Sequence, residues 1–193
     1  PFRDPGLRDF LALSLSRMGY LGVSFFFVLS GFLLMYAWKP TQASSVFWAR
    51  RAQKIFPNHI AMWCLCLLLF AWTNTTSKGI VLSFLLLHSF SPDPSINVAV
   101  NPPSWSLCCE LLFYALFPML APRIRRINRV WLWRSLFACL IATILVATVD
   151  QYLVPSIPKS PLTPVSNTQF WFGYLFPVGR LPEFLSGMIL CRI

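Results

Sequence analysis

The chain has 193 residues, of which 56% are hydrophobic, 16% aromatic and only 11% charged, and its mean hydropathy is +0.63. A soluble domain of this size needs more polar side chains to cover its surface, so the composition indicates a protein that crosses the membrane several times. The net charge of +10 does not indicate nucleic-acid binding, because the cations gather in short segments between apolar runs, as in membrane proteins that follow the positive-inside rule.

Several apolar stretches predict membrane helices. Five are long enough to span a bilayer, at residues 20–38, 55–72, 105–121, 131–149 and 171–191. Residues 80–90 are too few to cross and predict a re-entrant segment. We therefore expect an all-α fold, a polytopic membrane helical bundle with about five spanning helices and one short re-entrant segment in a single domain over residues 1–193.

Two basic segments predict the orientation of these helices. Residues 39–54 follow the first span, residues 122–134 follow the span at 105–121, and each segment contains several Lys or Arg residues. Both are expected to be cytoplasmic loops, which requires an even number of crossings between them. The spans at 55–72 and 105–121 supply two, whereas a third crossing at residues 80–90 would place one basic segment outside.

The chain begins at Pro1, and its first sixteen residues do not have the layout of a signal peptide, so we expect a piece of a longer protein. Its 6 cysteines all lie in apolar runs, with no CxxC pair and no histidine at ligand spacing. They predict buried thiols, with neither a disulfide framework nor a metal site.

One acid interrupts the apolar segment WSLCCELLFY. On a helix, Glu110 shares its face with Ser106 and Tyr114, each one turn away. A carboxyl group at membrane depth is costly unless it is paired or faces water, which favours a functional role for Glu110. A structural acid that locks helix packing is the alternative.

A basic cluster precedes the second span in the motif WARRAQKIFP. On a helix, Arg50, Arg51 and Lys54 would gather at the cytoplasmic interface. Arginine suits phosphate groups, so the cluster could bind an anionic ligand. Contact with anionic lipid headgroups explains the same spacing equally well.

Other polar residues in apolar runs have structural interpretations. Arg180 and Glu183 lie three apart around Pro182 and predict either a structural ion pair, which we favour, or a cavity-facing site. Ser30 with Gly31, and Gly187, predict helix contacts or a kink, because no base for Ser30 lies nearby in the sequence.

Four motifs in order carry a family resemblance: GYLGVSFFFVLSGFLL, FWARRAQKIFP, PPSWSLCCELLFYALFP and GRLPEFLSGMIL. Together they resemble the acyltransferase 3 family of integral membrane acyltransferases. The resemblance implies an enzyme that moves an acyl group, commonly acetyl, from acyl-CoA to a hydroxyl of a carbohydrate, lipid or secondary metabolite. It also implies that this chain lacks the family's first helix and its C-terminal helices, and is inactive by itself.

By position, Glu110 matches the acid of the family's WSLxxE motif, with a role in binding the acceptor or orienting a histidine. Arg50, Arg51 and Lys54 match the basic cluster and would bind acyl-CoA, while Ser30 matches the serine of the FxLSGF motif. No metal is implied.

Three positions depart from the family pattern. Ser24 stands where an acid is usual, Lys54 replaces an arginine, and His59 stands where an aromatic residue is common. The family's catalytic histidine would precede Pro1, so neither His59 nor His88 matches it. The expected partners are the lipid bilayer and a hydroxyl-bearing acceptor; no nucleic acid and no particular oligomeric state is predicted.

Two alternatives to an active acyltransferase stay open at this point. One is a transporter or flippase-like protein in which Glu110, Arg180 and Glu183 line a polar path. The other is an inactive relative that keeps only the scaffold.

Overall fold

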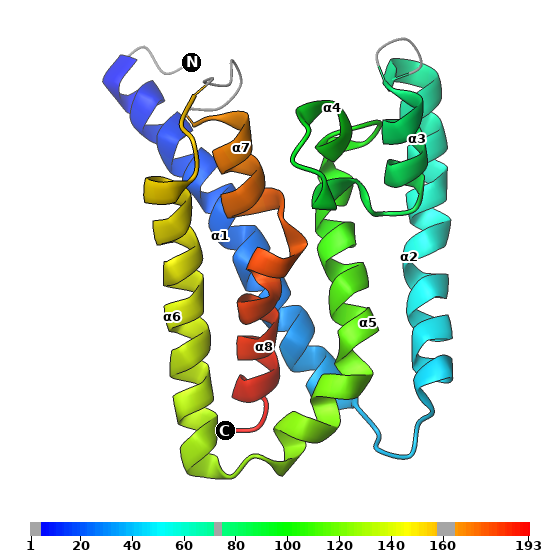
Figure 1. Cartoon of the computed structure of the whole chain (residues 1–193), viewed down its shortest axis with the longest axis vertical. Coiled ribbons are helices and arrows are strands. Elements are labelled where there is room, and N and C mark those ends of the chain that lie inside the picture. The colour runs from blue at the N-terminus through cyan, green and yellow to red at the C-terminus, as the bar shows by residue number, and fades with distance from the viewer. Residues whose placement is uncertain (1–4, 72–74, 158–164) are drawn as a thin grey trace.

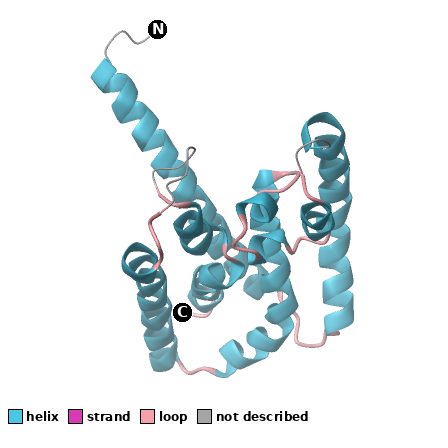
Figure 2. Cartoon of the chain, turned by 45° about the horizontal axis from the view of Figure 1, so that its top comes forward, coloured by secondary structure: helices cyan, strands magenta, loops and turns pink. Residues whose placement is uncertain are grey.

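The computed structural model describes residues 5–71, 75–157 and 165–193, and its elements in these ranges are helices joined by short loops (Figure 2). This confirms the all-α expectation. Four long helices run along the long axis of the molecule, and each runs in the opposite direction to the one before it in the chain (Figure 1). They are α1 (Pro5–Ala37), α2 (Ser44–Cys66), α5 (Trp105–Arg126) and α6 (Arg129–Leu153).

Among the described residues, three helical segments are long and apolar enough to cross a membrane: Ser44–Phe70, Pro102–Arg126 and Arg129–Leu153. The first includes α2 and part of the π-helical turn η1 (Leu67–Ala71) that continues it. The apolar part of α1, Leu21–Ala37, is shorter. The fold is therefore that of an integral membrane protein.

The predicted span at residues 171–191 is not one continuous helix. After the short helix α7 (Asn167–Phe170) the chain forms a π turn, η4 (Trp171–Leu175), then a 3₁₀ turn, η5 (Pro177–Arg180), and only then α8 (Leu181–Leu190). Pro177 has no N–H and holds the preceding residue, Phe176, in an extended conformation, which stops the helix. Pro182 in the first turn of α8 is compatible with the restart.

The helix around the basic cluster begins earlier than expected. α2 starts at Ser44, so most of residues 39–54 is helix and not a loop. The arginines that follow the predicted span at residues 105–121 are likewise helical, since Arg123 and Arg126 lie in the last turn of α5. A new helix follows at once, because the Asn128 side chain accepts a hydrogen bond from the N–H of Trp131 and caps α6.

Residues 77–104 form a compact group at one end of α2 and α5 (Figure 1). The group contains α3 (Ser77–Phe84), η2 (His88–Phe90), α4 (Pro94–Asn97) and η3 (Pro102–Ser104), none of which is long enough to span a bilayer. The α1–α2 and α5–α6 connections both lie at the opposite end of the bundle (Figure 1). Two long helices therefore separate the two basic segments.

The centre of the bundle is the contact between α1 and α8, with α5 and α6 beside it (Figure 1). A Cβ atom at Gly31 would overlap the carbonyl oxygen of Phe184, and one at Gly187 would overlap the carbonyl oxygen of Val28. The two backbones touch at these glycines, as predicted for close helix packing. Next to them, the rings of Phe113 and Phe184 stack with centroids 4.7 Å apart.

Candidate functional site

A cavity of about 650 Å³ lies between α1, α2 and α5, within the size range of small-molecule sites. Its wall is mostly apolar, but polar side chains from the three helices converge on it. Five of them are residues singled out in the sequence, namely Ser30, Arg51, Lys54, Glu110 and Tyr114. Helix packing therefore joins three of the four family motifs in one site.

Glu110 is partnered in this cavity. It is 7% exposed, and its carboxyl interacts with the Tyr114 side chain one turn further along α5. The charges of Arg51 and Lys54 on α2 act on it, and Tyr114 also interacts with Ser30 on α1. Nearby opposite charge offsets the cost of a carboxylate at membrane depth, which accounts for this acid in an apolar segment.

Arg51 is held by aromatic rings and keeps one donor unused. Its guanidinium carbon lies 5.5 Å from the ring centroid of Phe47 and 5.7 Å from that of Tyr114. Its Nε atom is buried and has no hydrogen-bond partner. A buried, unpaired guanidinium donor at a cavity is suited to an anionic ligand oxygen.

A smaller apolar groove of about 230 Å³ adjoins the cavity. Trp48, Ala52, Leu111 and Ala115 line it, and it shares Arg51, Ile55 and Tyr114 with the cavity. The indole N–H of Trp48 donates to the carbonyl of Tyr114 at 3.0 Å, which ties α2 to α5 there. The shared residues separate the cavity from the smaller groove.

Two residues predicted for this site are not in it. Arg50 is exposed and does not line the cavity, because adjacent residues on a helix point about 100° apart. The Ser106 hydroxyl donates to the carbonyl of Pro103 at 3.2 Å, at the start of α5. Ser106 thus satisfies the backbone before the helix and does not serve Glu110.

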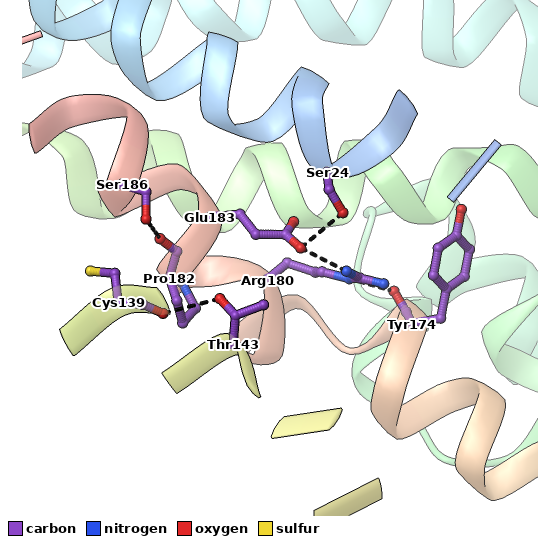
Figure 3. A network of polar contacts seen from close by, with 8 residues as sticks. All are labelled: Ser24, Cys139, Thr143, Tyr174, Arg180, Pro182, Glu183 and Ser186. Carbon is purple, nitrogen blue, oxygen red and sulfur yellow. Dashed lines mark hydrogen bonds and ion pairs between the residues drawn. The ribbon is translucent and has the colours of Figure 1, made fainter. Parts of the chain in front are cut away.

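Arg180 and Glu183 form an ion pair away from the cavity (Figure 3). Arg180 NH1 lies 2.9 Å from Glu183 Oε1, and the Ser24 hydroxyl on α1 donates to the same oxygen at 3.0 Å. Arg180 Nε donates to the carbonyl of Tyr174 at 3.0 Å, and the guanidinium lies over the Tyr174 ring. This network joins α1 to α8, whereas the transport alternative requires these two residues to share a polar path with Glu110.

The cavity also contains Asn58, His59 and Asn101, for which the sequence predicted no role. The sequence contains a pattern that places Asn58 and His59 in the cavity. Starting from Arg51, the cavity residues of α2 recur at i+3, i+4, i+7, i+8 and i+11, which is one helix face. The face was missed because the helix was expected to begin at residue 55.

His88 lies outside the cavity and is fully buried. Its Nδ1 is 3.4 Å from Cys108 Sγ, and its Nε2 is 3.3 Å from the Ser104 hydroxyl. Burial lowers the pKa of His88 to about 4. His88 is therefore neutral at physiological pH.

All six cysteines are free thiols; Cys108 and Cys109 are buried within the protein, whereas Cys64 is exposed. Among the residues whose placement is described, no three His, Cys, Asp or Glu side chains come together as a metal site.

Two comparisons with known proteins identify the family of this chain. A family model described as "Acyltransferase domain" matches residues 1–193. "Acyltransferase MdmB" of Streptomyces mycarofaciens is 32% identical over 188 residues, which are 94% of this chain and 48% of that protein. The chain thus spans about half the length of this curated relative, and no solved structure matches it. Both matches carry the same conclusion, that this integral membrane chain belongs to the acyltransferase 3 family.

Proposed function

We propose that the chain forms part of a membrane enzyme that transfers an acyl group from acyl-CoA to a hydroxyl of a carbohydrate, lipid or secondary metabolite. Acetyl is the acyl group that we propose. The observation that carries the proposal is the cavity in which Glu110 meets Arg51 and Lys54. The Glu110 carboxyl is suited to accept a hydrogen bond from a hydroxyl, and the two cations are suited to phosphate. Family membership supports the reaction class.

The donor would enter from the end of the bundle where the basic segments lie, which we propose to be cytoplasmic. Arg51 and Lys54 bind the phosphates of coenzyme A, and the unpaired Arg51 Nε supplies one of the donors. Arg50, exposed on α2, meets lipid headgroups or bulk solvent.

In the reaction, the acceptor oxygen attacks the thioester carbonyl, a C–O bond forms and the C–S bond breaks. The hydroxyl proton passes to a base and then to the departing coenzyme A sulfur. The family resemblance assigns that base to a histidine outside this chain. Glu110 accepts the hydrogen bond of the acceptor hydroxyl or orients the base, and Tyr114 and the two cations hold its carboxylate in place.

The test is transfer of labelled acetyl from acetyl-CoA into washed membranes that contain the full-length protein, with Glu110→Gln compared to wild type at matched expression. Gln keeps the size of the side chain and removes its charge, so we expect transfer to fall at least tenfold if the carboxylate acts in the reaction. Ser106→Ala is the matched control, because Ser106 lies one turn away and contacts the Pro103 carbonyl.

Equal transfer by Glu110→Gln and wild type would make Glu110 a structural residue. No transfer by wild type above empty membranes would contradict the proposed donor.

A further inference from the structure

His59 has a hydrogen-bonding arrangement that fixes which of its ring nitrogens can accept. The residue is 2% exposed and lies in the cavity wall, on the same face of α2 as Arg51 and Lys54. Its Nε2 atom is 3.2 Å from the carbonyl oxygen of Ser83 and 3.1 Å from that of Phe84. Carbonyl oxygens only accept hydrogen bonds, so Nε2 carries the proton and donates to both.

In the neutral ring, Nδ1 is then an acceptor. This atom is buried and has no hydrogen-bond partner. Buried polar atoms in proteins are almost always paired, and one that is not requires an explanation. Solvent does not supply one here, because Nδ1 has less than 1 Å² of accessible surface.

The charged groups of the cavity are of a different kind. Arg51 and Lys54 only donate hydrogen bonds, and Glu110, which interacts with Tyr114 and the two cations, is the charged acceptor. A ligand in this cavity that carries N–H or O–H groups needs neutral acceptors as well as phosphate-binding donors. In the tautomer that these contacts select, His59 offers a buried acceptor nitrogen, and its second nitrogen is anchored to the backbone.

We propose that His59 is a ligand-binding residue of the acyl-transfer site, whose Nδ1 accepts a hydrogen bond from an N–H or O–H group of the bound substrates. The inference rests on the proposed function. Two groups share the required chemistry: an amide N–H in the arm of acyl-CoA, and the acceptor hydroxyl. Binding includes a local adjustment of the cavity wall that uncovers Nδ1, while Nε2 stays bonded to α3.

The test uses His59→Gln in the full-length protein. The Gln side-chain amide can still donate to the carbonyls of Ser83 and Phe84, but it has no acceptor at the position of Nδ1. Ser83→Ala is the control, since it removes the 2.8 Å hydrogen bond from Trp63 Nε1 to the Ser83 hydroxyl, which joins α2 to the same short helix α3. The two variants are compared at equal amounts of folded protein.

Three quantities are measured: binding of coenzyme A, binding of adenosine 3′,5′-bisphosphate, which lacks the amide arm, and acetyl transfer to the membrane acceptor. If Nδ1 binds the arm, His59→Gln weakens coenzyme A about fivefold and leaves the bisphosphate unchanged. If Nδ1 binds the acceptor, both affinities stay unchanged and acetyl transfer falls about fivefold. Either result supports the inference, provided that Ser83→Ala does not reproduce it.

Wild-type affinities and wild-type transfer in His59→Gln would overturn it. That result is distinct from failure of the proposed function, in which the wild-type protein itself neither binds coenzyme A nor transfers acetyl.

Discussion

The contact between α1 and α8 predicts that alanine substitution lowers the stability of the protein far more at Gly187 than at Gly22. In Gly187→Ala, the new Cβ would overlap the carbonyl oxygen of Val28 and lie 2.9 Å from the backbone nitrogen of Phe32, where ordinary contacts begin at 3.4 Å. Both atoms belong to the backbone of α1, so no side chain can rotate away and the helices must move apart. Overpacking of this kind costs about 1 to 3 kcal/mol, and backbone contact favours the upper end.

At about 2 to 4 °C per kcal/mol for a chain of this size, a loss near 3 kcal/mol lowers the Tm by about 6 to 12 °C, to be measured as thermal unfolding of the full-length protein in detergent. Gly22→Ala is the matched control. It lies on α1, but its added Cβ would meet no atom within 4 Å, and alanine favours the helix more than glycine. We expect its Tm to be unchanged or slightly raised. Equal Tm values for the two variants would refute the backbone contact between α1 and α8.

Three further predictions concern charged and titratable side chains. Glu183→Ala leaves Arg180 buried without its carboxylate and should destabilise the protein by about 3 kcal/mol, whereas Ser24→Ala removes one hydrogen bond and should cost about 1 kcal/mol; comparable Tm losses would contradict this ranking. Because the pKa of His88 is about 4 when folded and 6.5 in its ordinary state, the unfolded chain binds the proton first. Stability should therefore be full above pH 6.5 and fall by about 3 kcal/mol as the pH drops through 4, with a flatter pH profile of Tm in His88→Asn. Arg51→Ala should raise the apparent KM for acetyl-CoA about tenfold and lower kcat less, while Arg50→Ala leaves that KM near wild type; an unchanged KM in Arg51→Ala would remove the residue from the donor site.

Much of the architecture follows from local features of the sequence. The excess of apolar residues predicts membrane helices, because backbone groups in lipid must be satisfied within the segment itself. Gly31 and Gly187 predict a close helix contact, since only a residue without a side chain lets two backbones touch. The acid in WSLCCELLFY indicates a site, because a carboxyl at membrane depth needs a partner.

Helix boundaries were predicted less well, and the errors have specific causes. A hydropathy pattern marks only where apolar residues begin, so it predicts a loop over the polar first turns of α2, which starts at Ser44. The helix face that leads from Arg51 to His59 is therefore not apparent from hydropathy. Conversely, hydropathy predicts one span over residues 171–191, although Pro177 interrupts its hydrogen bonding.

The membership of the site was decided only by the tertiary structure. Spacing along one helix shows which residues share a face, but not which other helix that face meets. The packing of α1, α2 and α5 brings Ser30, Arg51 and Glu110 to one cavity and leaves Arg50 outside it. The same packing leaves His59 Nδ1 without a partner. Composition and local patterns thus identify a membrane helical protein with a buried acid. The packing of distant helices determines which groups surround that acid, because contacts between residues far apart in the chain leave no periodic trace within any one segment.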